Sequence, residues 1–158
     1  MTLKRILLLF GIILILFVGF VGYQTIAKNG ASVLGNKTGK VTLGTTTMTV
    51  EVVDSEKDKQ VGLSKKKSLA ENRGMLFLFE KPALYSFWMK NMQFPIDIIF
   101  LNDNKIVTIY DNIQPPVDKT SPLPLYHPKT PADKVLETKA GLSDKLKLKE
   151  GDTLNLTI

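Results

Sequence analysis

The fold of this chain is decided by residues 84–110, which read LYSFWMKNMQFPIDIIFLNDNKIVTIY. The stretch contains three short apolar runs, each rich in aromatic or β-branched residues and bounded by proline, asparagine or aspartate. We predict a strand in each run, at 84–92, 96–101 and 105–110, with a turn at 102–104 between the last two. Runs of this length and composition are typical of buried strands, so the centre of the chain predicts β structure.

Further strands are predicted on both sides of this stretch. Residues 46–53 alternate between apolar and polar side chains, as a strand buried on one face does. Gly44-Thr45 is a Gly-first pair suited to a type II′ hairpin turn between this strand and the one before it. The remaining strands are predicted at 41–43, 46–53, 74–79, 134–138 and 154–158.

Helices play a small part in the predicted fold. Residues 54–73 are mostly polar and predict a short helix or an irregular arm, and Ser143 is placed to cap a short helical turn. Many short strands with one or two short helices predict a mainly β fold, a compact antiparallel barrel or sandwich. A long irregular region follows the central strands at 111–131 and carries six of the eight prolines.

The N-terminus predicts a membrane anchor. Residues 6–23 are uncharged and mostly Leu, Ile, Phe or Val, and as a helix they span about 27 Å, close to the hydrocarbon core of a bilayer. Lys4 and Arg5 precede the segment and favour a cytoplasmic N-terminus. We therefore predict a signal anchor at 1–23, a flexible linker at 24–40 and an extracytoplasmic β domain at 41–158. The alternative is cleavage after Ala27, which releases a secreted domain.

The distribution of charge argues against nucleic acid as a partner. The chain has a net charge of +6, but residues 1–40 hold five basic side chains and no acidic one. Residues 41–158 hold the other 16 basic and all 15 acidic side chains, a net charge of +1, so the predicted domain has no basic footprint. The chain has no cysteine, which excludes disulfides, thiolate metal sites and a cysteine nucleophile.

Asp97 and Lys90 are the most informative charged pair. If 92–95 forms a four-residue hairpin loop, Lys90 lies directly opposite Asp97 on the neighbouring strand. Asp97 is followed by four apolar residues, and a carboxylate in such a strand requires a partner. One interpretation is a buried ion pair that fixes the strand register. The other is a pair lining a cleft, with Asp97 as a base or ligand anchor and with Asn91 and Trp88 shaping the pocket.

Trp88, His127 and the methionines are further candidate residues, each with a structural and a functional interpretation. Trp88, the only tryptophan, is either a core residue or a stacking platform for a planar ligand. His127, the only histidine, lies beside Tyr126 in the proline-rich region and excludes a multi-histidine metal site. The methionines favour core packing over a Cu(I) site. We predict no metal and no cofactor.

Several blocks of this sequence together resemble the domain of unknown function 192 family. The most specific are Phe87-Trp88-Met89-Lys90-Asn91 and Pro95-Ile96-Asp97-Ile98-Ile99-Phe100. Blocks at 61–63 and 74–79 come before them, and Tyr126, 131–132, 135–137, 140–141 and 151–152 follow in the family's order. The resemblance implies a compact β-barrel or sandwich, often behind a signal sequence or anchor in prokaryotes, and it supplies no established activity. Ser64 and Lys147 depart from the family pattern, which commonly has Met and Gly at these positions.

These observations favour a membrane-tethered, extracytoplasmic module that binds a ligand or partner. The chain has no recognisable nucleophile motif or phosphate-binding glycine loop. The alternatives are an enzyme acting on envelope carbohydrate through Asp97 and a purely structural envelope protein. The expected partners are the membrane, through residues 6–23, and a cell-envelope protein or carbohydrate. The candidate ligand-binding or structural residues are Trp88, Lys90, Asn91, Asp97, Tyr126 and His127.

Overall fold

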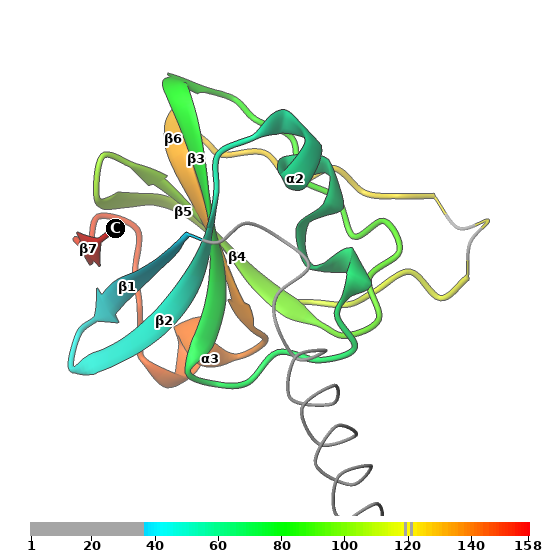
Figure 1. Ribbon diagram of the computed structural model, residues 1–158, viewed down its shortest axis with the longest axis horizontal. Coiled ribbons are helices and arrows are strands. Elements are labelled where there is room, and N and C mark those ends of the chain that lie inside the picture. The colour runs from blue at the N-terminus through cyan, green and yellow to red at the C-terminus, as the bar shows by residue number, and fades with distance from the viewer. Residues whose placement is uncertain (1–36, 119, 121) are drawn as a thin grey trace, which may run out of the picture. The chain divides into compact units, whose positions relative to one another are not determined.

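The computed structural model describes residues 37–118, 120 and 122–158, which form a curled β-sheet with short helices (Figure 1). The predicted anchor and most of the predicted linker lie outside the described residues. Within the described part, no helix is both long and apolar enough to cross a membrane. The elements, in chain order, are β1 (Thr38–Leu43), β2 (Thr46–Val53), α2 (Glu56–Val61), the 3-10 helix η1 (Gly62–Lys65), β3 (Arg73–Ala83), β4 (Ile96–Asn102), β5 (Lys105–Ile113), β6 (Ala132–Lys139), α3 (Leu142–Lys145) and β7 (Asn155–Thr157).

The seven strands form one mixed sheet in the order β5-β4-β6-β3-β2-β1-β7, curled into a half-barrel (Figure 1). The prediction of an antiparallel fold is wrong at one position, because β2 and β3 pair in parallel. Parallel neighbours require a crossover connection, and here α2 and η1 form it. The helix α2 confirms the prediction of a short helix in 54–73. The predicted hairpin at Gly44 is also confirmed, because the φ of Gly44 is 59°, as a Gly-first turn requires.

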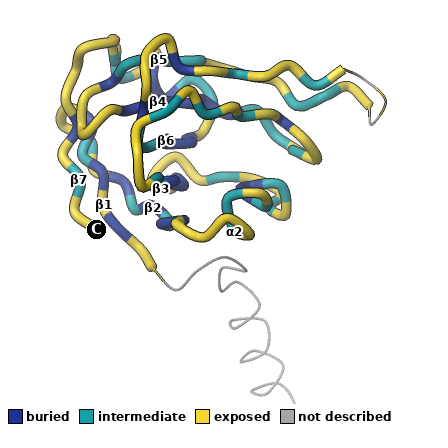
Figure 2. Tube along the Cα trace, turned by 90° about the horizontal axis from the view of Figure 1, so that it is seen from above, coloured by how far each residue is buried: buried dark blue, intermediate teal, exposed yellow. Residues whose placement is uncertain are grey.

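The two faces of the sheet carry separate apolar cores. Figure 2 shows that the buried residues are concentrated in the strands. The alternating residues Met48, Val50 and Val52 of β2 enter one core, together with Leu76 from β3 and Leu136 from β6. The other core contains the residues on the opposite face, and α2, η1 and the segment 84–95 cover it. Its buried members include Leu63, Met75, Phe77, Met89, Ile98, Phe100 and Val135. A sheet that is apolar on both faces explains why residues 98–101, which follow Asp97 in β4, form a continuous apolar run.

The prediction of a strand at 84–92 is wrong. The pairing of β3 with β6 shifts register between Leu78 and Ala83, and β3 ends there. After β3, the segment 84–95 pairs with no strand in the described part of the chain. It forms one bridge, in which Phe87 and Tyr126 exchange backbone hydrogen bonds of 3.0 and 2.9 Å. Without a neighbouring strand the segment 84–95 runs over the sheet instead of through it, and Trp88 is 50% exposed rather than in the core.

The predicted boundary of the linker is also too late by three residues. β1 begins at Thr38, so residues 38–40 belong to the sheet, where Lys40 pairs with both Thr49 and Thr157. The remaining predicted strands at 46–53, 74–79, 96–101, 105–110, 134–138 and 154–158 all fall within or overlap observed strands. The proline-rich region begins after β5, which extends to Ile113, and runs to Pro131.

Candidate functional site

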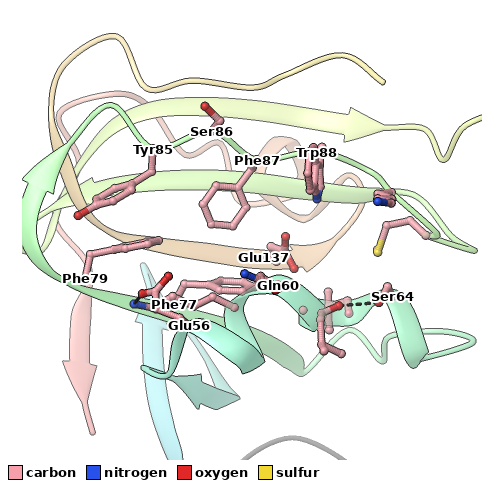
Figure 3. Close-up of a pocket in the computed structure, with 16 residues that line it drawn as sticks. Glu56, Gln60, Ser64, Phe77, Phe79, Tyr85, Ser86, Phe87, Trp88 and Glu137 are labelled. Carbon is pink, nitrogen blue, oxygen red and sulfur yellow. Dashed lines mark hydrogen bonds and ion pairs between the residues drawn. The ribbon is translucent and has the colours of Figure 1, made fainter. Parts of the chain in front are cut away.

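A pocket of about 260 Å³ opens between the α2–η1 crossover and the segment 84–95 (Figure 3). Residues of β3 and β6 form the base of the pocket. The pocket therefore lies on the face of the sheet whose core contains Met75 and Phe77. Figure 3 shows Phe87 and Trp88 on one side, Gln60 and Ser64 on the other, and Glu137 between them. The lining residues are Glu56, Lys59–Ser64, Phe77, Phe79, Tyr85–Trp88, Lys90, Met92 and Glu137.

Glu137 is the polar group at the base of the pocket. It lies on β6, which is hydrogen-bonded on both sides, and its cross-strand neighbours are Met75 on β3 and Ile98 on β4. Both neighbours are fully buried, and Glu137 itself is only 6% exposed. Its Oε2 atom is buried without a hydrogen-bond partner among the described residues. Burial without a compensating charge raises the pKa of Glu137 to about 8, so the carboxyl group is mostly protonated at neutral pH.

Aromatic rings form the wall above Glu137. Phe87 meets Phe77 edge to face, with ring centroids 5.1 Å apart, and Phe79 stacks on Tyr85 at 3.7 Å. Trp88 follows Phe87 in the chain and leaves half of its surface open to solvent. Such rings offer a large apolar surface to a ligand at a low cost in conformational entropy, because they have only two side-chain torsions.

Two lysines line the pocket, Lys59 with a side chain that is only 12% exposed and Lys90 exposed at the mouth, and they differ in their partners. Lys59 lies over the ring of Phe79 at 4.5 Å and also pairs with Glu56, at 2.9 Å between Nζ and Oε1. Lys90 lies over the ring of Trp88 at 5.4 Å, and the described residues provide it with no acidic partner. The mouth therefore carries one uncompensated positive charge.

A helix cap and a glycine determine where the α2–η1 crossover begins and turns. Ser55 caps α2 by accepting a hydrogen bond from the Asp58 N–H, and Glu56 and Asp58 complement the helix dipole in the first turn. Gly62 ends α2 with a φ of 49°, a conformation that is strained for residues with a side chain. A Cβ at this position would lie 3.5 Å from Cζ of Phe77, an ordinary van der Waals contact, so the positive φ and not a lack of space favours glycine here.

Asp97 lies away from this pocket and is saturated with hydrogen bonds. Its Oδ1 accepts from the backbone N–H groups of Asn112 and Gly141, each at 2.8 Å. Its Oδ2 accepts from Ser143 N at 2.8 Å and from Ser143 Oγ at 2.6 Å. The side chain is fully buried. Asp97 therefore joins β4, β5 and the start of α3, and neither oxygen is open to a substrate.

The predicted Lys90–Asp97 pair does not form. The pairing depended on a hairpin between 84–92 and 96–101, but β4 pairs with β5 and β6 instead. β5 has a bulge opposite Asp97, because Ile96 pairs with Ile113 while Ile98 pairs with Tyr110. The carboxylate of Asp97 takes the Asn112 N–H at this bulge, so backbone donors, and not a lysine, satisfy it.

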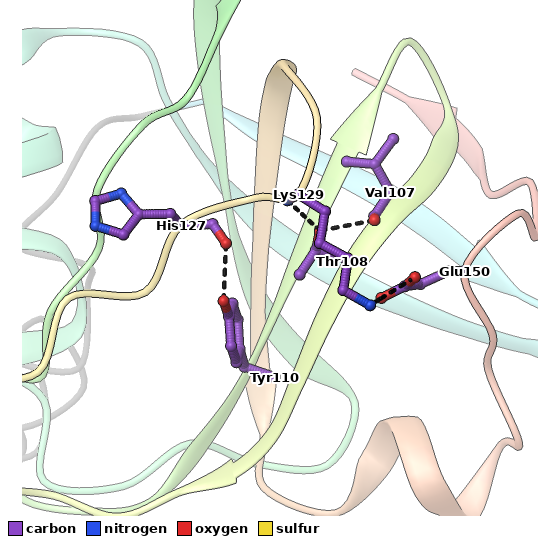
Figure 4. A network of polar contacts seen from close by, with 6 residues as sticks. All are labelled: Val107, Thr108, Tyr110, His127, Lys129 and Glu150. Atoms are coloured by element: carbon purple, nitrogen blue, oxygen red, sulfur yellow. Dashed lines mark hydrogen bonds and ion pairs between the residues drawn. The ribbon is translucent and has the colours of Figure 1, made fainter.

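Tyr126 and His127 connect the proline-rich region to the sheet, and Figure 4 shows the contact of His127 with Tyr110. Tyr110 packs edge to face on Tyr126, and its hydroxyl donates to the His127 carbonyl at 2.8 Å. Two residues further, the Lys129 N–H donates to Thr108 Oγ1. The His127 ring is exposed and lies 3.2 Å from Ser86 Oγ, and Figure 3 shows that hydroxyl pointing away from the pocket.

The structure thus brings together only two of the six candidate residues at the pocket, Trp88 and Lys90. Asn91 lies next to them in a turn, with a φ of 60°, while Asp97, Tyr126 and His127 do not line the pocket. Glu137 was not among the residues singled out from the sequence. The available signal was an acidic residue inside the predicted strand 134–138, directly after the apolar pair Val135 and Leu136.

The four methionines considered for Cu(I) are divided between the two faces of the sheet. Met48 lies in the core on one face, whereas Met75 and Met89 lie in the core on the other face and Met92 packs against that core. Among residues 37–118, 120 and 122–158, no three His, Cys, Asp or Glu side chains are arranged to hold a metal ion.

Comparisons with known proteins identify relatives without an established activity. The model of the DUF192 family, described as "Uncharacterized ACR", matches residues 39–156. No curated protein matches the chain. A protein of unknown function from Novosphingobium aromaticivorans DSM 12444 is 30% identical, with a TM-score of 0.66 over 79% of this chain and 88% of that one. A proposed transcription regulator from Sinorhizobium meliloti 1021 is 28% identical, with a TM-score of 0.64 over 75% and 91%.

Proposed function

The chain belongs to the domain of unknown function 192 family, and from its pocket geometry we propose that it is a small-ligand-binding module. The observation that carries this proposal is Glu137, a buried carboxyl group with an unpartnered oxygen at the base of an open aromatic pocket. A buried polar group of this kind destabilises the fold unless something binds it. A ligand that accepts or donates a hydrogen bond at Glu137 satisfies it.

The contrast with Asp97 supports a binding role for Glu137. Both are buried acids in central strands of the same sheet. Asp97 receives four hydrogen bonds from the protein, while the described residues leave Glu137 Oε2 without one. An acid needed only for folding is expected to resemble Asp97. A polar group that lowers the stability of the fold and lies inside a pocket is typical of a functional site.

A catalytic role is the second candidate, and it is favoured by the raised pKa of Glu137. A carboxyl group with a pKa of about 8 is suited to act as a general acid near neutral pH. Binding is preferred because the only other acid in the lining, Glu56, has an 83% exposed side chain paired with Lys59. An enzyme acting on carbohydrate through Asp97 is disfavoured, because both of its oxygens are occupied.

We also propose that this module acts on the outer face of a membrane. The support is the uncharged apolar segment 6–23 with Lys4 and Arg5 before it. The near-neutral charge of residues 41–158 gives no support for nucleic acid binding, which the description of the Sinorhizobium relative would suggest.

A fragment screen by NMR, with a blocked pocket as the control, tests the binding proposal. The full-length protein in detergent micelles is screened against a library of small aromatic and aliphatic fragments. Ser64→Phe places a ring inside the pocket, and Ser68→Phe adds the same ring at an exposed position outside it. We expect fragments that bind wild type and Ser68→Phe but lose binding to Ser64→Phe. Equal binding of every fragment to both variants would contradict a ligand site here.

A further inference from the structure

We propose that the ligand is a small aromatic carboxylate that carries a hydrogen-bond acceptor opposite its carboxylate. In this arrangement the acceptor meets Glu137, the ring lies against Phe87 and Trp88, and the carboxylate meets Lys90 at the mouth. This assignment rests on the proposed ligand-binding function and names the chemical class that the pocket fits.

The inner end of the pocket selects an acceptor. Glu137 is flanked by Met75 and Ile98, which offer no hydrogen bond, and its Oε2 has no partner among the described residues. A carboxyl group in such surroundings holds its proton, in keeping with the pKa of about 8 that burial gives it. A protonated carboxyl group donates one hydrogen bond. A ketone, amide or hydroxyl oxygen of the ligand is the matching acceptor.

The middle of the pocket selects a flat, apolar body. Phe87 and Trp88 lie on one side of the space and Phe77 lies on the other (Figure 3), and Val61 and Leu63 also line it. The volume of about 260 Å³ lies just below the range of about 300–1,000 Å³ that is usual for drug-sized ligands. The pocket therefore has room for a single ring with short substituents at its two ends.

The mouth selects a negative charge. The charged or titratable groups around the pocket, besides Glu137, are Glu56 and Lys59 on α2 and Tyr85 and Lys90 on the segment 84–95. Glu56 and Lys59 compensate each other, which leaves Lys90 uncompensated. A cationic ligand would meet this charge unfavourably, while a carboxylate would pair with it.

Three matched probes separate these contributions. The first is 4-acetylbenzoate, which has a ring, a ketone acceptor and a carboxylate. The second is 4-isopropylbenzoate, which lacks the acceptor, and the third is 4′-methylacetophenone, which lacks the carboxylate. The chain has one tryptophan, so Trp88 gives a single indole N–H signal, and its shift reports binding in the pocket directly. For 4-acetylbenzoate we expect a Kd in the millimolar range, as is usual for about twelve non-hydrogen atoms.

The variants are compared for one probe at a time, in the full-length protein in detergent micelles, so that partition of the probe into the micelle cancels. Glu137→Leu should weaken 4-acetylbenzoate by about 3- to 10-fold and leave 4-isopropylbenzoate unchanged. Glu137→Gln should keep the affinity, because its amide also donates a hydrogen bond. For wild type the affinity should fall above pH 8, where Glu137 loses its proton, and for Glu137→Gln it should not.

Lys90→Met should weaken 4-acetylbenzoate by about 2- to 5-fold and leave 4′-methylacetophenone unchanged. Lys67→Met removes an exposed lysine that does not line the pocket and should change neither affinity. Thermal unfolding of each variant verifies that it is folded.

Each contrary result has a distinct meaning. If Glu137→Leu weakens both benzoates equally, or if Lys90→Met weakens the neutral ketone as much as the carboxylate, the proposed ligand class is wrong. Tighter binding of 4-acetylbenzylamine than of 4-acetylbenzoate would overturn it in favour of a cationic ligand. If fragments bind in the pocket but these benzoates do not, the ligand class fails and the binding function stands. If nothing binds there, both fail.

Discussion

Glu137→Gln should stabilise the domain, and the gain should grow with pH. The pKa of Glu137 is about 8 in the folded chain, against an ordinary value of 4.5, because burial disfavours the charged form. Between these two values the folded chain holds a proton that the unfolded chain has already released. The stability of the wild type therefore falls as the pH rises from about 4.5 to about 8.

The size of the effect follows from the shift in pKa. One pKa unit corresponds to about 1.4 kcal/mol. The wild type therefore loses about 3 kcal/mol by pH 7 and about 4–5 kcal/mol above pH 8, relative to its stability below pH 4.5. Glutamine has nearly the shape of the protonated acid and does not titrate, so the variant escapes this loss. The gain should be smallest at pH 4 and should increase by several kcal/mol by pH 9.

Urea unfolding at a series of pH values measures the gain. The fluorescence of Trp88, the only tryptophan, reports unfolding in both proteins, and the difference between them cancels the other titrating groups. Glu150→Gln is a control, because Glu150 does not line the pocket and forms a surface ion pair with Lys129. A difference between wild type and Glu137→Gln that stays constant from pH 4 to pH 9 would refute the protonated state of Glu137.

Four further outcomes are expected. Asp97→Asn turns one acceptor oxygen into a donor that faces two other donors, and it should lower the free energy of unfolding by about 3–5 kcal/mol in urea titrations. Ser143→Ala, which removes one of the four hydrogen bonds, should cost about 1.5–3 kcal/mol by the same measurement. Lys90→Met should change stability by less than about 0.5 kcal/mol, whereas a loss of several kcal/mol would restore the idea of a buried pair with Asp97. Lys147→Gly should raise the melting temperature, since Lys147 has a φ of 54° and glycine relieves about 1 kcal/mol of strain; an unchanged or lower value would argue against a strained cap.

The case of Lys147 shows what the family pattern could and could not predict. The pattern commonly has a glycine where this chain has Lys147, and a glycine at the end of a helix suits a left-handed cap. The structure keeps that cap, because the Lys147 N–H donates to the Asp144 carbonyl and the Leu148 N–H to the Ser143 carbonyl. These two bonds form a Schellman motif, which holds the backbone in place whatever the side chain.

Most strands could be predicted from the sequence, because alternation and apolar runs report burial directly. Residues 84–92 misled the prediction, since they have the composition of a strand but no neighbour to pair with. Pairing depends on what lies beside the segment, and local composition carries no such information. The register shift of β3 after Leu78 and the bridge between Phe87 and Tyr126 arise from tertiary structure.

The roles of the two acids were beyond prediction for a related reason. The donors to Asp97 come from Asn112, Gly141 and Ser143, which lie 15 to 46 residues away in the chain. Glu137 stands out only when its position on a strand paired on both sides, with the pocket above it, is known. Of the Trp-Met-Lys-Asn block that the sequence singled out, Trp88 and Lys90 line the pocket.

The most direct test of a protonated ligand anchor is the carboxyl ¹³C titration of Glu137 by NMR, with the signal assigned by its absence in Glu137→Gln. In the free protein we expect a midpoint near pH 8. Saturation with 4-acetylbenzoate should raise the midpoint further, because a hydrogen bond from the protonated form stabilises that form. A midpoint near 4.5, or one that the ligand leaves unchanged, would contradict the account.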